Sequence, residues 1–149
     1  MGMYNVFETN KEMEQNGVWV DYGDFRVLIA SAGQGNKSYV SYAEKKLKPL
    51  RRALEAGAVS NERSQAAMAD IYAKTVVLDW EVLTKDDMTG EPIWTSGIEQ
   101  KDGSIVEFTQ EAVEAVFLAL PRLFLDIQEQ AGSLSNFRLE ELEKEGKNS

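Results

Sequence analysis

The first regular pattern in the chain is a pair of β-branched and aromatic runs, at residues 17–21 and 25–30. Runs of this kind are typical of strands. The segment between them, Asp21-Tyr22-Gly23-Asp24, contains a glycine that can take a positive φ in a tight turn. The pattern predicts an N-terminal β-hairpin, followed by a flexible glycine-containing loop at residues 31–37.

Apolar residues spaced by three and four positions predict a first long helix. Ser38 is its expected N-cap, and Gly57 is expected to end it. Pro49 lies inside this helix and should kink or interrupt it, because proline lacks an N–H and its ring clashes with the preceding turn. The apolar face consists of Tyr39, Ala43, Leu47, Leu50 and Leu54.

A second helix is expected to begin after a cap at Ser60 or Asn61 and to continue to about Val82. A single apolar stripe supports it. The residues of this stripe are Met68, Ile71, Tyr72, Thr75, Leu78 and Val82.

The second half of the chain begins with a segment rich in Asp, Gly and Pro. Within it, residues 94–108 predict a second hairpin that turns at Asp102-Gly103. Thr109 is the expected cap of a third helix, and Pro121 suits the first turn of a fourth helix that ends at Gly132. The apolar residues that these two helices carry are Val113, Val116, Phe117 and Leu120, then Phe124, Ile127 and Ala131.

These elements predict one α+β domain over residues 1–149, dominated by helices, with an N-terminal β-hairpin and a candidate second hairpin. A chain of 149 residues can bury a sizeable core in a single domain. Residues 1–10 and about 140–149 are expected to be flexible. No run of about 18 apolar residues and no signal-peptide pattern is present, so we expect a protein of the host cytoplasm that does not bind membranes.

Composition removes several kinds of chemistry. The chain has no histidine and no cysteine, which excludes thiolate nucleophiles, Ser-His pairs and cysteine-ligated metal sites. With 16 basic and 25 acidic residues its net charge is −9, which disfavours nucleic acid as a partner. We therefore expect a protein that is not an enzyme, needs no cofactor and no metal, and works by binding another protein.

The charge is unevenly distributed. Residues 37–59 carry six bases and two acids, whereas residues 60–149 carry eight bases and eighteen acids. The bases of the first helix either form a solvated face or dock an acidic partner, which includes an acidic copy of the same chain. The partner-binding candidates in this helix are Lys45, Lys46, Lys48, Arg51 and Arg52.

Three local patterns resemble chemical sites only weakly. Residues 31–38 have the order of a phosphate-binding loop, but Ser31 and Asn36 stand where a Walker loop needs glycine. The acidic turn at residues 86–91 lacks the ligand spacing of an EF-hand and is more typical of a solvated turn. Asp79 and Glu81 flank a tryptophan, but adjacent helical positions point apart, which disfavours a catalytic pair.

Six short stretches are informative together through their order and spacing. They are Gly17-Val18-Trp19-Val20-Asp21-Tyr22-Gly23, Leu47-Lys48-Pro49-Leu50-Arg51-Arg52, Val76-Val77-Leu78-Asp79-Trp80-Glu81, Glu91-Pro92-Ile93, Phe108-Thr109 and Asn136-Phe137-Arg138. Through them the chain resembles, over most of its length, the tail assembly chaperones of long-tailed bacteriophages. It differs from that family at residues 94–103, where the family is shorter.

The resemblance implies a chaperone that keeps the tape-measure protein soluble while tail-tube subunits assemble, and that is absent from the mature virion. It also implies a longer form made by ribosomal frameshifting, with which Gly146-Lys147 is compatible. An amphipathic surface suits such a role. Apart from the basic helix, its candidate contacts are Trp19, Trp94, Phe137, Arg138 and Leu142, with core packing as the alternative for Trp19 and Phe137. A homo-oligomer is a further expected assembly. The competing hypotheses are an acidic inhibitor of a basic host protein and a carboxylate-dependent metal enzyme.

Overall fold

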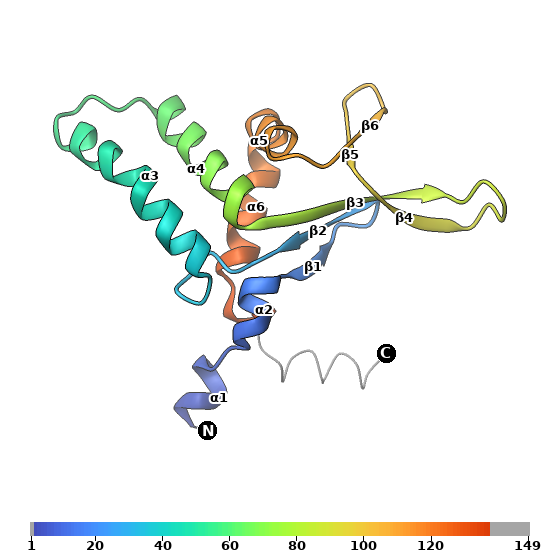
Figure 1. Ribbon diagram of the computed structural model, residues 1–149, viewed down its shortest axis with the longest axis horizontal. Coiled ribbons are helices and arrows are strands. Elements are labelled where there is room, and N and C mark those ends of the chain that lie inside the picture. The colour runs from blue at the N-terminus through green and yellow to red at the C-terminus, as the bar shows by residue number, and fades with distance from the viewer. Residues whose placement is uncertain (1, 138–149) are drawn as a thin grey trace.

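The computed structural model describes residues 2–137, and its centre is a four-stranded antiparallel sheet with the order β1-β2-β3-β4 (Figure 1). The first two strands pair in register, Trp19 opposite Leu28, and Gly23 in their turn has a φ of +97°. The predicted N-terminal hairpin is therefore confirmed. The strands are β1 (Val18–Asp21), β2 (Phe25–Ile29), β3 (Val77–Lys85) and β4 (Pro92–Ser96).

Strand β3 corrects the prediction that the second helix continues to Val82. That helix, α4 (Asn61–Thr75), starts from the predicted cap at Ser60 and ends before the strand begins. Buried Trp80 and Val82 alternate with the less buried Glu81. This period of two is that of a strand, and the β-branched and aromatic residues here pack between β2 and β4.

The first long helix, α3 (Lys37–Glu55), begins one residue earlier than its expected cap. Its N-cap is Asn36 rather than Ser38, because the Asn36 side chain accepts a hydrogen bond from the N–H of Tyr39. The same buried side chain donates to the carbonyl oxygens of Ser31 and Thr75, both at 2.9 Å. Asn36 therefore caps α3 and also ties the preceding loop to the end of α4.

Helix α3 continues through Pro49, so of the two predicted effects of this proline the interruption does not occur. Pro49 is exposed, while its neighbour Leu50 is buried. Packing against α4 on the buried side holds the helix together despite the hydrogen bond that proline cannot make. As predicted, Gly57 ends the helix: it has a φ of +71°, and the next residue, Ala58, donates to the carbonyl of Ala53.

The last two helices are close to their predictions. Thr109 caps α5 (Gln110–Ala119) by accepting a hydrogen bond from Ala112, and α6 (Pro121–Gly132) has its proline in the first turn. The second hairpin exists but is short, because Trp94 belongs to β4; it turns at Asp102-Gly103. The remaining elements are α1 (Met3–Phe7), α2 (Lys11–Asn16), β5 (Ile98–Glu99), β6 (Ile105–Val106) and the 3₁₀ helix η1 (Leu134–Phe137).

The core lies on one face of the sheet. Buried residues of β2 and β3 pack there against α4, α5 and α6, which lie together on that face in Figure 1. Alternate strand residues point to the opposite face and are only partly buried or exposed. The fold is thus an α+β domain, as predicted, with helices on one face of its sheet. No helix among residues 2–137 is long and apolar enough to cross a membrane.

Candidate binding surfaces

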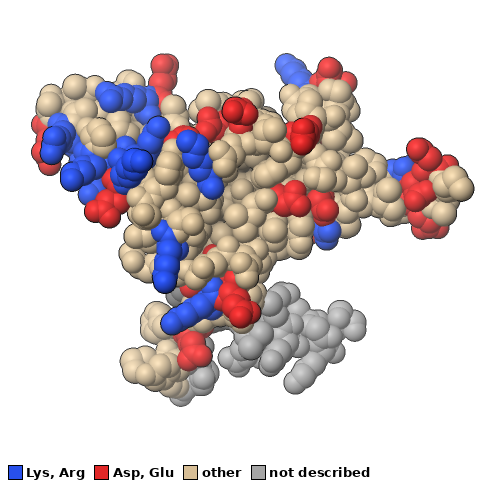
Figure 2. Space-filling model, viewed as in Figure 1, with Lys and Arg blue, Asp and Glu red and all other residues tan. Residues whose placement is uncertain are grey.

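The bases of α3 form an exposed surface, here called the basic face: Lys45, Lys46, Lys48, Arg51 and Arg52. Figure 2 shows basic side chains clustered at the left end of the molecule, where α3 lies in the same view in Figure 1. Lys46 forms an ion pair with Asp70 of α4 at 3.2 Å, and its side chain is 46% exposed. For the other four bases, no ion-pair partner is found among residues 2–137. All five predicted contacts in this helix are therefore accessible.

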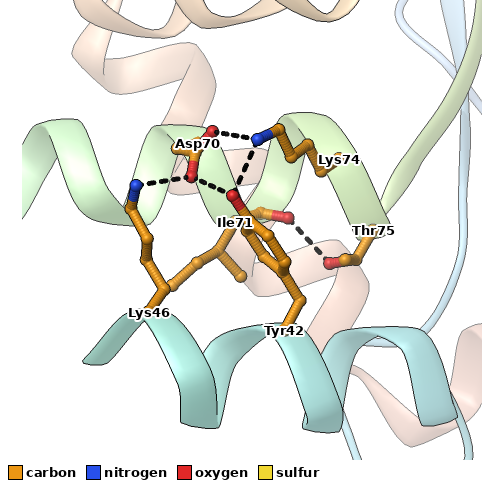
Figure 3. A network of polar contacts seen from close by, with 6 residues as sticks. All are labelled: Tyr42, Lys46, Asp70, Ile71, Lys74 and Thr75. Carbon is orange, nitrogen blue, oxygen red and sulfur yellow. Dashed lines mark hydrogen bonds and ion pairs between the residues drawn. The ribbon is translucent and has the colours of Figure 1, made fainter. Parts of the chain in front are cut away.

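A polar network joins α3 to α4 behind the basic face (Figure 3). Asp70 accepts a hydrogen bond of 2.5 Å from the hydroxyl of Tyr42 and pairs with the ammonium groups of Lys46 and Lys74. Lys74 also donates to the Tyr42 oxygen at 2.8 Å. The carboxylate is only 15% exposed, so it acts as an anchor that fixes the position of α3 on α4.

Glu114 of α5 extends this network to a third helix. Burial alone would raise the pKa of Asp70, but hydrogen bonds from Tyr42, Glu114, Lys46 and Lys74 lower it to about 2. Burial, and then the hydrogen bond and charge of Asp70, raise the pKa of Glu114 above its usual value. The two neighbouring carboxyl groups are therefore shifted in opposite directions, with the pKa of Asp70 lowered and the pKa of Glu114 raised.

The glycine-containing loop at residues 31–37 faces an acid. Glu14 of α2 is buried and accepts a hydrogen bond of 2.6 Å from Thr9. A side chain added at Gly35 would place its Cβ only 1.5 Å from the Glu14 carboxylate oxygen. The carboxylate therefore lies directly against the loop, where it would repel a phosphate group. This geometry agrees with the missing glycines in disfavouring a phosphate site.

The acidic segment at residues 86–91 is the turn between β3 and β4. Asp86 accepts hydrogen bonds from the backbone N–H groups of Met88 and Thr89, and Gly90 has a φ of +72°. Asp86 therefore acts as the structural residue of a turn, which agrees with the solvated-turn interpretation. Within the described part of the chain, no cluster of three or more acidic side chains suited to a metal ion is found.

The face of the sheet opposite the helices carries exposed apolar side chains. We call it the outer sheet face. Leu78 and Leu83 are each 36% exposed, and Trp19 is 38% exposed. Strand pairing places Asp79 and Glu81 on this face as well, on the side of β3 opposite the buried Trp80. The residues of this face are Trp19, Arg26, Leu28, Leu78, Asp79, Glu81, Leu83 and Trp94.

Arg26 lies at the centre of the outer sheet face, between two indole rings. Its guanidinium is 4.3 Å from the ring centroid of Trp19 and 4.6 Å from that of Trp94. It also forms an ion pair with Glu81, to which Nε donates a 2.7 Å hydrogen bond. Stacking and ion pairing fix three large side chains in one orientation before any partner binds.

The sequence pattern identifies Trp19 and Trp94 as candidate contacts but does not indicate that both lie against Arg26. This arrangement depends on strand β3, which pairs Glu81 with Arg26 of β2. A helix over residues 76–82, as the sequence pattern predicts, does not provide this pairing. Alternation around Trp80 would have revealed the strand.

The other predicted contacts have different outcomes. Phe137 is only 1% exposed and lies in the core, which supports its alternative interpretation and removes it from the accessible surface. Its carbonyl accepts a 2.7 Å hydrogen bond from the N–H of Asn10, so η1 is tied to the start of α2. Arg138 and Leu142 lie outside the described residues.

The fold is that of a small α+β protein with two marked exposed surfaces. The outer sheet face is apolar and lies on strands, and the basic face lies on helix α3. The model of the YdaY prophage protein family matches residues 34–148, which is most of the chain. This chain belongs to the YdaY prophage protein family and is therefore of phage origin. No curated protein matches the sequence significantly, and no solved structure does.

Proposed function

We propose that this phage protein is a non-enzymatic tail assembly chaperone, which binds the tape-measure protein in the host cytoplasm, helps to recruit tail-tube subunits and is absent from the finished virion. Membership of a prophage family supports a role in the phage life cycle. The resemblance to tail assembly chaperones, carried by motifs such as Val76-Val77-Leu78-Asp79-Trp80-Glu81, supports the more specific role.

The outer sheet face is the observation that carries this proposal. A tape-measure protein is long and helix-rich, and before assembly its helices expose apolar stripes. The outer sheet face offers two indoles and several leucines around a fixed arginine, and tryptophan and arginine are enriched in protein-binding hot spots. The net charge of −9 would keep the complex in solution while apolar surfaces are shared.

Co-expression with the tape-measure protein of the same prophage tests the function. The soluble yield of the tape-measure protein should rise, and the two chains should purify together. Leu83→Glu in the outer sheet face should abolish both effects. Leu125→Glu is the matched control, because Leu125 is an exposed leucine, 59% accessible, on helix α6.

Absence of a complex and of any gain in soluble yield, with the short chain and with a frameshifted form, would refute the chaperone function. Loss through Leu125→Glu with Leu83→Glu unaffected would retain the function but refute the outer sheet face as its site. Salt-sensitive capture of a basic host protein, with the tape-measure protein unbound, would support the inhibitor hypothesis instead.

A further inference from the structure

The molecule has two oppositely charged ends. Residues 37–59, which include α3, carry six bases and two acids, a net charge of +4. Residues 85–107, which include the β3–β4 turn and the short second hairpin, carry two bases and six acids, a net charge of −4. Figures 1 and 2 show that α3 and the β3–β4 turn lie at opposite ends of the longest axis. The two charges therefore cannot neutralise each other within one chain.

The basic end carries a shallow, open depression with a volume of about 600 Å³ along the exposed side of α3, lined by residues of this helix. Its lining includes the charged residues Lys45, Lys48, Arg52 and Glu44, a net charge of +2, together with Pro49. The proline ring and the methylene stems of the basic side chains form an apolar floor below a charged rim. This combination suits a flexible, unbranched apolar side chain that is flanked by acids.

The β3–β4 turn has that combination. Met88 is 93% exposed at the turn and packs on almost nothing in its own chain. Asp86 is occupied by the backbone of the turn, which leaves the exposed carboxylates of Asp87 and Glu91 free to pair with another molecule. Figure 1 shows this turn projecting beyond the body of the protein, so that it can reach into a depression on a neighbour.

We propose that the β3–β4 turn of one copy docks into the depression on α3 of a second copy. Met88 contacts Pro49, while Asp87 and Glu91 pair with Lys48 and Arg52. The contact is heterologous, because it joins two different surfaces. An assembly therefore keeps a free turn at one end and a free depression at the other, so further copies add head to tail. Because the contact involves few residues, the association between two copies is weak and reversible.

Salt should affect this association in two directions. Whole chains of charge −9 repel each other when the Debye length is long, about 30 Å at 0.01 M salt. At about 0.15 M that repulsion is screened beyond roughly 8 Å, while close ion pairs persist. At about 1 M the ion pairs are screened as well. Self-association is therefore expected to be strongest at intermediate salt.

Self-association is measured by sedimentation velocity of the purified chain over a concentration series at low, intermediate and high salt. The pair Lys48→Glu with Arg52→Glu, the pair Asp87→Lys with Glu91→Lys, and Met88→Ala should each weaken association at least tenfold. A mixture of the two charge-reversed chains should regain it, because each reversed surface then faces an opposite charge. Arg122→Glu and Glu129→Lys are matched controls on exposed positions of α6 and should leave association intact.

A chain that stays monomeric at every salt and concentration would overturn the proposal. So would association that the reversed pairs leave unchanged, or a mixture of reversed chains that does not associate while circular dichroism shows both to be folded. The experiment uses this protein alone. Its outcome is therefore independent of whether the tape-measure protein binds.

Discussion

The hydroxyl of Tyr22 donates a 2.5 Å hydrogen bond to Asp126, which joins the β1–β2 turn to helix α6 across 104 positions of the chain. The Tyr22 ring stacks on Phe25 at 4.9 Å, and Phe25 stacks on Trp80 at 5.6 Å. Burial, followed by the hydrogen bond and charge of Asp126, raises the pKa of Tyr22 above its usual value. This contact closes one end of the interface between the sheet and the last helix.

Tyr22→Phe retains the stacked rings and removes only this hydrogen bond. We expect the free energy of unfolding at pH 7 to fall by about 1–2 kcal/mol, because the partly buried Asp126 loses its donor. Denaturant unfolding measures the change. Combining Tyr22→Phe with Asp126→Ala should cost less than the sum of the two single changes, since both remove the same hydrogen bond. Fully additive costs would show that the bond contributes nothing.

The paired carboxyl groups of Asp70 and Glu114 predict two opposite pH dependences. The lowered pKa of Asp70 stabilises the fold above its usual pKa of 3.8, and this contribution is lost as the pH falls towards 2. The raised pKa of Glu114 acts in the opposite direction. Its proton is retained in the fold above the usual value of 4.5, so the fold loses stability as the pH rises through the raised pKa.

Glu114→Gln tests the second dependence, because glutamine can still donate to Asp70 but cannot ionise. The stability of the variant relative to the native chain should increase as the pH rises from 4.5 to 7.5. Asp70→Asn should instead lower stability at pH 7 by about 2 kcal/mol, the equivalent of its pKa shift. Denaturant unfolding at four pH values checks both. A pH-independent difference in stability for Glu114→Gln would contradict the raised pKa of Glu114.

Gly35→Ala should destabilise the fold by about 1–3 kcal/mol, because the added methyl group would overlap the buried Glu14 carboxylate. Thermal unfolding measures the loss. Glu14→Ala in the same chain removes the overlap, so alanine at position 35 should cost little in that background. Gly33→Ala, in the same loop, is the matched control, since its nearest contact would be the Ser31 hydroxyl at 3.2 Å. Equal costs in both backgrounds would exclude the steric explanation.

Local signals in the sequence sufficed where one short segment determines the structure. The Gly23 turn, the Thr109 cap and the proline at the start of α6 all act within a few residues, and each was predicted. Residues 76–82 have apolar positions that satisfy a helical stripe as well as strand alternation, and only pairing with β2 and β4 decides between them. Asn36 was missed for a similar reason, since its bond to the Thr75 carbonyl spans 39 positions.

The basic face was predictable because it lies on one helix and depends only on composition. The outer sheet face was not, because Trp19, Arg26, Glu81 and Trp94 come from four strands and meet only through the register of the sheet. Whether Phe137 is buried also depends on distant parts of the chain. The sequence pattern leaves its exposure open, and in the structure it is buried and its carbonyl is bonded to the start of α2.

Arg26→Lys tests whether the outer sheet face acts as a preorganised unit. Lysine keeps the charge but loses the planar group that stacks between Trp19 and Trp94 and pairs with Glu81. We expect the tryptophan emission to shift to longer wavelength as the two indoles become more solvated, while the buried Trp80 contributes a constant background. Stability should fall by about 1–2 kcal/mol, the sum of two partly exposed cation–π contacts.

Arg26→Lys also tests whether partner binding requires the fixed orientation of the two indoles or only their apolar area. If the arginine holds the indoles in place for a partner, Arg26→Lys should weaken binding of the tape-measure protein by roughly tenfold, although it removes no apolar side chain. Arg122→Lys, on the exposed side of α6, is the control and should change neither emission nor binding. An emission shift with unchanged binding would mean that the indoles need no fixed orientation. Unchanged emission would mean that the stacked arrangement does not persist in solution.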